Sequence, residues 1–494
     1  MTTHHQTNVP LRIALQFTAV AQNFPNMPAV VSDVAEISYL QLLGSAISFA
    51  KRLRALGVDR TSTIALNTGD MPSSLSVMLA SSFLGCQLIT ASELLSRQQT
   101  VTPTHFVKTP EAKGKSTVDF IEIDETWFDG VIEISREDID AFEGHDSLDD
   151  PWLLLHTSGT TGKPKFMALT NRIVSDRTKA IAADFPTAQI TCALLFNCTS
   201  RPFYARAIGA LLNACTIIDS RSLPFWQKMG VNAFFCSPSQ YDEFFEGASF
   251  EGKFAKIEVS GAKLTDEVAR RLADNFETIV DIYGASETNK SYANFIKVKP
   301  DGTVMRMGRK LDSEIQIIDE DGNLCAPGTS GVVRVRNSYL IDGYISAPKA
   351  TDVNFKDGWF FPGDIATWGP ANELNIIGRT DEVISFGGVK LDADLIDRIF
   401  KATIGVKDGA CIKNPRADRR EVTGFIVYEP GVDKQTVDAA IRENYQMCTG
   451  LPCFLGRLHT VNKIPRTAEG RPLRNVFESL VPTGANEDSA KADI

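Results

Sequence analysis

The residues best suited to chemistry lie at 157–165, in the segment TSGTTGKPK. Gly159 and Gly162 let the backbone come close to an anion. Lys165 adds a positive charge, and hydroxyls that can donate hydrogen bonds to phosphate oxygens come from Thr157, Ser158, Thr160 and Thr161. The segment is not a Walker loop, which requires GxxxxGK followed by Ser or Thr. It is too specific for an ordinary Ser/Gly turn, and it predicts a phosphate-binding loop of another kind.

Further motifs follow this loop in a fixed order: SGAKL at 260–264, YGASET at 283–288, GWFFPGD at 358–364, IIGRTDEVISFGG at 376–388 and PRTAEGRPLR at 465–474. Together they closely resemble the signatures of the adenylate-forming superfamily. That superfamily contains acyl- and aryl-CoA synthetases, adenylation domains of peptide synthetases and beetle luciferases. The resemblance covers about residues 10–480. It implies an enzyme that activates a carboxylic acid with ATP as an acyl-AMP and then passes the acyl group to a thiol.

The resemblance also implies how the nucleotide is bound. Tyr283 and Gly284 match the turn that receives the adenine, and the small residues on the other side of the base match Ser260, Gly261 and Ala262. Asp364 matches the carboxylate that accepts hydrogen bonds from both ribose hydroxyls. Arg379 matches an arginine near the ribose and the phosphates. The alternative for Tyr283 is plain core packing, and for Asp364 and Arg379 it is a solvated surface charge.

Four residues match catalytic positions of the superfamily: Lys165, Ser286, Glu287 and Arg471. Ser286 stands where a threonine usually contacts the α-phosphate, and Glu287 matches the acid that binds Mg²⁺. Arg471 replaces the lysine that serves as the cation of the adenylation step. A guanidinium keeps the charge but arranges its donors differently from an ammonium. Arg471 therefore does the lysine's work less well, or makes adenylation slow, or marks its loss, and the sequence leaves these three interpretations open.

The C-terminal motifs imply a conformational change between the two half-reactions. Asp381 matches the hinge between a large N-terminal and a small C-terminal domain, a position that absorbs a large backbone rotation. In the thioester-forming conformation, the thiol tunnel would be lined by Phe386, Gly387 and Gly388. ATP, Mg²⁺ and coenzyme A are the cofactors that the resemblance implies, with a carrier protein as the alternative thiol donor.

The acid pocket is the least defined part of the site. The histidine-containing pocket motif of the superfamily corresponds here to LLFNCTS, so Asn197 takes the place of the histidine or, shifted by one residue, matches an asparagine of aryl-acid adenylating enzymes. The second alignment suggests a hydroxylated aromatic acid. The candidate pocket residues are Phe196, Asn197, Phe235, Cys236 and Ser237. The alternative is that Phe196 and Phe235 are core residues.

Composition is consistent with an enzyme for small substrates. The net charge of −10 argues against broad electrostatic binding to nucleic acid or anionic lipid. The nine cysteines form no CxxC pair and lie mostly in apolar stretches, which favours buried free thiols in a reducing compartment. No apolar run is long enough to cross a bilayer, and the first residues do not resemble a secretory signal. We therefore expect a cytoplasmic protein.

The elements that must position these residues follow a βαβ rhythm. A helical stripe at 40–56 ends at Gly57, and strand-helix-strand patterns follow at 63–90, 192–218 and 256–283. Beyond about residue 300, short alternating runs such as GTVMRMG, SEIQIID and GVVRVRN indicate a smaller antiparallel unit. The predicted fold class is α/β. A large N-terminal domain (1–379) holds mostly parallel sheets with an antiparallel subdomain at about 300–379, and a smaller mobile α+β domain follows (380–494).

The leading functional interpretation is an acyl- or aryl-CoA ligase for an aromatic or other hydrophobic acid. The nearest alternative is a stand-alone adenylation enzyme that loads a separate carrier protein. A third is a catalytically weakened paralogue that binds nucleotide or acyl-adenylate, which only Arg471 supports.

Overall fold

The structure of the chain is a computed structural model. It describes residues 12–89, 101–110, 120–129, 133–157, 165–185, 190–198, 200–245, 252–380, 383–386, 389–413, 421–449, 454–466 and 472–478.

A nine-stranded sheet is the largest element of the fold, with the strand order β15-β14-β13-β12-β11-β9-β10-β1-β2. Six central strands of this sheet are parallel, namely β13, β12, β11, β9, β10 and β1. At one edge β2 pairs antiparallel with β1, and at the other edge β14 and β15 also join antiparallel. The strands are β1 (Pro28–Ser32), β2 (Glu36–Ser38), β9 (Thr191–Leu194), β10 (Thr216–Asp219), β11 (Ala233–Cys236), β12 (Phe254–Ser260), β13 (Phe276–Ala285), β14 (Asn289–Val298) and β15 (Val304–Lys310).

A second sheet of six strands has the order β6-β5-β3-β4-β7-β8 and ends in the antiparallel pair β7–β8. Its strands are β3 (Thr63–Asn67), β4 (Gln87–Ile89), β5 (His105–Lys108), β6 (Phe120–Glu122), β7 (Pro151–Thr157) and β8 (Lys165–Thr170). The helices that accompany the two sheets are α1 (Ile13–Asn23), α2 (Tyr39–Ala55), α3 (Met71–Leu84), α4 (Arg136–Asp140), α5 (Asn171–Ala180), α6 (Arg201–Leu212), α7 (Leu223–Lys228), α8 (Pro238–Phe245) and α9 (Asp266–Asn275), with short 3₁₀ turns η2 (Glu125–Phe128) and η3 (Ala182–Asp184).

Helices α2 and α3 show why these residues fold locally as they do. Ser38 and Gln41 form a capping box at the start of α2, and Asp70 caps α3. Gly85 ends α3 in the left-handed conformation (φ 71°), and a Cβ there would lie 2.2 Å from the backbone of Gly144. Both helices bury most of their side chains in the largest hydrophobic core, which we call the main core. They confirm the helix predicted at 40–56 and the helix of the strand-helix-strand pattern predicted at 63–90.

A smaller antiparallel sheet follows in the chain. It contains β16 (Glu314–Ile318), β17 (Gly331–Arg336), β18 (Phe355–Lys356), β19 (Trp359–Phe360), β20 (Asp364–Trp368) and β21 (Leu374–Arg379), with α10 (Pro348–Asn354) beside it. The run GTVMRMG was predicted in this unit, and that is wrong: β15 pairs with β14 as the edge of the nine-stranded sheet. An alternating pattern predicts a strand with one exposed face, but it does not predict the sheet to which the strand belongs.

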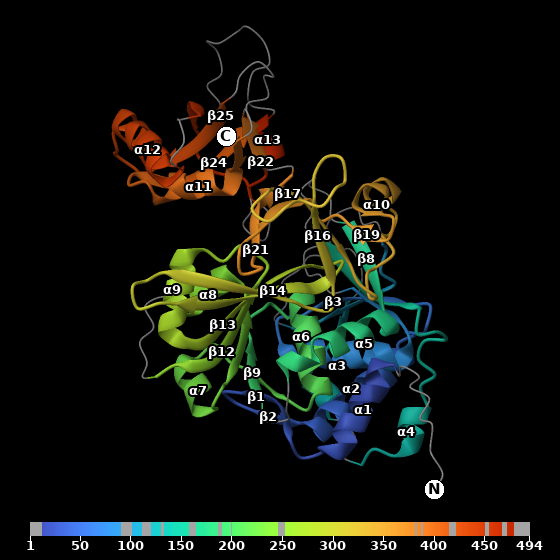
Figure 1. Cartoon of the computed structure of the whole chain (residues 1–494). Helices are drawn as coiled ribbons and strands as arrows, with labels where there is room; N and C mark the ends of the chain where they lie inside the picture. Colours follow the sequence, from blue (N-terminus) through green and yellow to red (C-terminus); the bar gives the residue numbers. More distant parts are fainter. Residues whose placement is uncertain are drawn as a thin grey trace.

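The C-terminal part is a separate α+β layer (Figure 1). A three-stranded sheet of β24 (Val406–Lys413), β25 (Val422–Tyr428) and β26 (Leu455–Thr460) carries α11 (Ala393–Ala402), α12 (Lys434–Thr449) and α13 (Arg474–Glu478). The hairpin β22 (Val383–Phe386) and β23 (Val389–Asp392) precedes it, after β21. Figure 1 shows these orange and red elements beyond β21, away from α1–α6. The predicted fold class is confirmed, while the domain limits at 379 and 380 stay a prediction.

Two further expectations concern thiols and membranes. Of the described cysteines, Cys86, Cys192, Cys198, Cys215, Cys236 and Cys411 are buried free thiols, Cys325 is half-buried and Cys448 is exposed. Among the described residues, none of the helices has the length and apolar character that spanning a membrane requires.

Candidate active site

The ends of the predicted phosphate loop are held by a strand ladder. Thr157 is the last residue of β7 and Lys165 the first of β8, and the two are backbone partners in the antiparallel pair. On its other side β8 meets the 345 segment, where the Ile345 N–H donates to the Phe166 carbonyl at 2.7 Å. Lys165 is therefore paired with Thr157 on one side, and its neighbour Phe166 is bound by Ile345 on the other. The other loop candidates (Ser158, Gly159, Thr160, Thr161 and Gly162) lie outside the described residues.

Lys165 and Glu287 meet at Tyr344. The Lys165 ammonium lies 5.1 Å from the centre of the Tyr344 ring, and the Tyr344 hydroxyl donates to Glu287 Oε1 at 2.6 Å. Glu287 is only 6% exposed. Burial, followed by the charge of Glu287, raises the pKa of Tyr344 well above its ordinary value, so the phenol keeps its proton and stays a donor. No pattern in the sequence singled out Tyr344, because its role depends on a contact between distant segments.

Ser286 and Glu287 lie in the turn of the β13–β14 hairpin, and Arg177 of α5 holds that turn. Its guanidinium donates to the Ser286 carbonyl at 3.0 Å, to the Glu287 carbonyl at 2.6 Å and to the Tyr339 carbonyl at 3.2 Å. Burial lowers the pKa of Arg177 to about 10, with Glu287 acting in the opposite sense. The side chain is thus a buried clamp on the segment that carries two of the predicted catalytic residues. An arginine on an amphipathic helix gives no such signal in the sequence.

The hairpin also explains two unusual backbone positions. A Cβ at Gly284 would lie 2.1 Å from the Asn289 carbonyl oxygen, so only glycine fits the close approach of the two strands. Asn289 has a left-handed backbone (φ 61°), which asparagine tolerates better than most residues. The YGASETN segment therefore has its glycine and asparagine where the turn requires them.

Tyr283, Asp364 and Arg379 come together, as the sequence predicted for the nucleotide site. The Tyr283 hydroxyl donates to Asp364 Oδ2 at 2.6 Å, and Arg379 Nη1 lies 3.5 Å from Asp364 Oδ1. Asp364 begins β20 and Arg379 ends β21, and the two are backbone partners. The contact thus joins β13 of the large sheet to the smaller antiparallel sheet. Burial raises the pKa of Tyr283 well above its ordinary value, so this phenol also stays a donor.

Ser260, Gly261 and Ala262 lie at the end of β12, beside β13, with Ser260 opposite Ile282 in the ladder. Gly261 has a positive φ of 94°. Ser260 is 3.5 Å from Arg206 of α6, which forms an ion pair with Glu258 at 2.9 Å.

Behind Ser260, charged side chains form a buried network. The Glu258 carboxylate also accepts from Lys290 at 2.6 Å, and Lys290 and Lys256 both bind Asp184. Arg206, Glu258 and Lys290 are all at most 5% exposed. Burying such charges is favourable only when they are paired, which they are here. A charged residue inside an apolar run, as in KIEVS, is the signal that the sequence carries for this network.

The five predicted pocket residues do not form one cluster. Phe196 and Phe235 belong to the main core, where the Phe196 ring lies 5.6 Å from the Arg206 guanidinium and Phe235 stacks on Phe185 at 5.3 Å. Cys236 belongs to the other core, around Trp226. Asn197 is exposed, and Ser237 bonds with Gln240 at the start of α8. Their assignment to the acid pocket stays a prediction.

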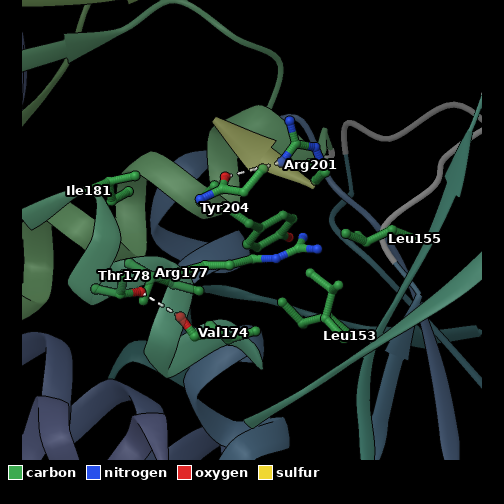
Figure 2. A pocket seen from close by; sticks show the side chains of 12 residues that line it. Leu153, Leu155, Val174, Arg177, Thr178, Ile181, Arg201 and Tyr204 are labelled. Atoms are coloured by element: carbon green, nitrogen blue, oxygen red, sulfur yellow. Dashed lines mark hydrogen bonds between the residues drawn. The ribbon is translucent and has the colours of Figure 1, made fainter. Parts of the chain in front are cut away.

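A cavity lies between α5, α6 and the β7–β8 pair, and we call it the α5–α6 cavity. Figure 2 shows Leu153 and Leu155 of β7 facing Arg177 of α5 and Arg201 of α6. Asn289, which follows the catalytic turn, also lines it. The space between its walls reaches about 380 Å³ only when open solvent is included, so the enclosed part is smaller than a typical ligand pocket.

The described residues fit a magnesium ion held together with nucleotide phosphates. Glu287 supplies one buried carboxylate, and Mg²⁺ commonly binds through one or two carboxylates plus substrate phosphates. In the part of the chain that the structure describes, no group of three or more His, Cys, Asp or Glu could hold a metal by itself.

Several predicted residues of the C-terminal part fall outside the described ranges. These are the hinge candidate Asp381, the tunnel candidates Gly387 and Gly388, and the cation Arg471. Phe386 is described only as the last residue of β22, paired with Val389. Arg466, near the start of the PRTAEGRPLR segment, binds Asp408 at 2.5 Å within the C-terminal part.

Comparison with known proteins gives the same picture at the level of the family. The family model described as AMP-binding enzyme matches residues 17–345. The 3-hydroxybenzoate–CoA/4-hydroxybenzoate–CoA ligase of Thauera aromatica is 25% identical over 347 residues, 65% of each chain. Triostin synthetase I of Streptomyces triostinicus is 26% identical over 353 residues, 68% of this chain and 66% of that protein. These matches span just under two thirds of the length of either relative.

A solved structure with the same fold is O-succinylbenzoate coenzyme A synthetase (MenE) from Bacillus subtilis in complex with AMP. It has a TM-score of 0.79 and 17% identity, over 97% of this chain and 99% of that chain. The same synthetase in complex with ATP and magnesium ion has a TM-score of 0.78 and 18% identity, over 93% of this chain and 98% of that chain.

Proposed function

Because the chain belongs to the AMP-binding enzyme family of adenylate-forming proteins, we propose that it activates a carboxylic acid with ATP and then forms a thioester, with coenzyme A as the thiol. The observation that carries the proposal is the convergence of two groups on the β13–β14 hairpin. Tyr283 contacts Asp364, and Glu287 contacts Tyr344, whose ring lies beside the Lys165 ammonium. The first group suits a nucleoside and the second suits its phosphates.

Each residue has a role that its surroundings support. The Tyr283 ring offers a face to the adenine, and Asp364 accepts hydrogen bonds from the ribose hydroxyls while Arg379 stays beside it. Lys165 neutralises phosphate charge at the end of the loop. Glu287, oriented by the Tyr344 hydroxyl, would hold Mg²⁺ together with the phosphates. The ion would supply charge neutralisation for the leaving pyrophosphate.

In the first half-reaction, a carboxylate oxygen of the acid attacks the α-phosphorus of ATP, and the bond to pyrophosphate breaks. Little covalent chemistry falls to the protein, so positioning and charge stabilisation account for most of the catalysis. In the second half-reaction, a thiol attacks the acyl carbon, loses its proton and displaces AMP. Between the two, residues 380–494 would turn about Asp381, bringing Arg471 to the site first and residues 386–388 second.

The test is an assay of both half-reactions. Purified protein with Mg²⁺ and a panel of carboxylic acids should support acid-dependent exchange of pyrophosphate into ATP, and mass spectrometry should find acyl-CoA when CoA is present. Lys165→Met should lower the exchange rate at least about tenfold, the effect of losing about 1.4 kcal/mol of charge stabilisation.

Acyl-AMP that accumulates even with CoA present would favour a carrier protein as acceptor. If neither product forms, the same panel with Arg471→Lys decides whether Arg471 has disabled adenylation. Failure of both proteins would refute the proposed function.

A further inference from the structure

The α5–α6 cavity has apolar walls and a polar end. Aliphatic side chains come from β7 and α5, among them Leu153, Leu155 and Val174, while Arg201 lies at a polar end (Figure 2). Asn289 also lines the cavity and accepts a hydrogen bond from Arg201. The cavity adjoins the proposed site at two places. Leu155 lies two residues before the end of β7, where the phosphate loop begins, and Asn289 directly follows the turn that carries Glu287. An acid bound here would be close to the phosphates.

Two buried donors at the polar end lack acceptors. Arg201 Nε and Asn289 Nδ2 have no hydrogen-bond partner within the described part of the chain, and Asn289 is only 1% exposed. The hydrogen bond that joins the two residues, from Arg201 Nη1 to Asn289 Oδ1, is long at 3.5 Å. Buried donors are normally satisfied, and those that are not call for an explanation such as a ligand. Both donors call for an oxygen acceptor.

The charges around Arg201 indicate that this acceptor is anionic. The neighbouring Arg206 is paired with Glu258, and Arg177 is bound by three carbonyls. Arg201 has no carboxylate within 4 Å among the described residues. Burial, with the charges of Arg206 and Arg177, lowers its pKa to about 9, while Glu287 acts in the opposite sense. A guanidinium in this setting is stabilised by a bound carboxylate, which it can engage through two N–H groups.

The carboxylate that reacts with ATP belongs beside the phosphates, which the proposed function places at Lys165. Lys165, at the end of the phosphate loop, is grouped with Tyr344 and Glu287. Arg201 starts α6 and is grouped with Asn289 instead. A monocarboxylic acid that reacts beside the phosphates leaves Arg201 without an anionic partner, whereas an acid with a second anionic group can supply one.

We propose that Arg201 and Asn289 bind a second carboxylate of the substrate, so that the enzyme activates a small dicarboxylic acid. This inference rests on the proposed function. It departs from the hydrophobic acid that the sequence suggested, because the cavity beside the catalytic turn has a cationic end.

Acids matched in size test the proposal: succinate against butyrate, glutarate against valerate, and isophthalate against 3-methylbenzoate, each at several concentrations. With the wild type, kcat/KM in pyrophosphate exchange should be at least about tenfold higher for the preferred dicarboxylate than for its partner. Arg201→Met should remove this preference at an unchanged KM for ATP. Asn289→Asp, which keeps a residue suited to the left-handed backbone, places a carboxylate beside Arg201 and should weaken dicarboxylate use similarly. Arg172→Met, at an exposed arginine of α5, is the matched control.

Other outcomes overturn the proposal in distinct ways. If the wild type and Arg201→Met both use dicarboxylic and monocarboxylic acids equally well, the second-carboxylate site is refuted, but the proposed adenylation activity is not. A raised KM for ATP with unchanged acid preference would assign Arg201 to the phosphates instead. Calorimetric binding of the dicarboxylates separates failure of the second-carboxylate site from failure of the proposed function. If the wild type binds a dicarboxylate, Arg201→Met abolishes this binding and no acid supports pyrophosphate exchange, the proposed function is refuted and the second-carboxylate site is retained. Absence of both binding and exchange would refute both.

Discussion

Arg177 offers the sharpest test of how the catalytic turn is held in place. Its buried guanidinium donates to the carbonyls of Ser286, Glu287 and Tyr339. Arg177→Met keeps most of the aliphatic stem and removes all three donors. Arg177 is the side chain that donates to these three carbonyls in the described part of the chain, so the variant leaves buried acceptors unsatisfied. We expect a loss of both stability and activity.

The magnitude follows from the number and kind of these bonds. A hydrogen bond to a charged donor contributes about 1.5–3 kcal/mol, and leaving a buried partner unpaired costs about 1–3 kcal/mol. The three bonds share one guanidinium and are not additive, so we expect about 3–5 kcal/mol in total. At roughly 2 °C per kcal/mol for a large folding unit, the unfolding midpoint should fall by about 6–10 °C. Arg177→Lys, a point charge with rotatable donors, should recover only part of this.

Thermal unfolding at one fixed scan rate measures the stability, and pyrophosphate exchange with the best acid measures the activity. Arg172→Met is the control, because Arg172 lies on the same helix but makes only an exposed ion pair with Asp149, which contributes at most about 1 kcal/mol. If Arg177→Met lowers the midpoint no more than Arg172→Met does, the buried clamp does not exist as described. A large fall in the midpoint with full activity would show that the turn holds its shape without Arg177.

Two further predictions concern the nucleotide and pH. Asp364→Asn should raise the KM for ATP about 10- to 100-fold, equivalent to about 1.4–2.8 kcal/mol, because an amide is a weaker acceptor than a carboxylate, and an unchanged KM would remove Asp364 from the ribose site. Burial lowers the pKa of His145 from 6.5 to about 4, so the unfolded chain takes up a proton between these values while the folded chain does not. Stability should fall by up to about 3 kcal/mol as pH drops from 6.5 to 4, and His145→Gln should lose less over the same range, as urea titrations at each pH would show.

The fold was largely predictable because its local signals agree with one another. Apolar spacing, the Ser38 and Asp70 caps and the left-handed Gly57 and Gly85 all mark the same helix limits. The strand GTVMRMG was assigned to the wrong sheet because alternation records burial of one face and carries no information on which strand lies beside it.

The candidate site was predictable only where its chemistry is contained in a short motif. Tyr283, Asp364 and Arg379 come together from three separate motifs, as the resemblance implied. Tyr344, Arg177 and Arg201 were missed because their roles arise from packing between distant segments. The acid pocket stays a prediction: alignment by motif points to Asn197, which does not line the α5–α6 cavity.

The double backbone anchorage of β8 has a consequence for engineering and for divergence. Lys165 is held by Thr157 on one side, and the next residue, Phe166, is held by Ile345 on the other. The position of Lys165 is therefore set by the β7–β8 ladder and by the bridge at Phe166, and not by the number of residues between Thr157 and Lys165. Insertions or exchanges within 158–164 can change the shape of that loop without shifting the lysine along its strand. The place of the Lys165 charge is thus independent of the length of the 158–164 segment, so this segment is suited to exchange between relatives.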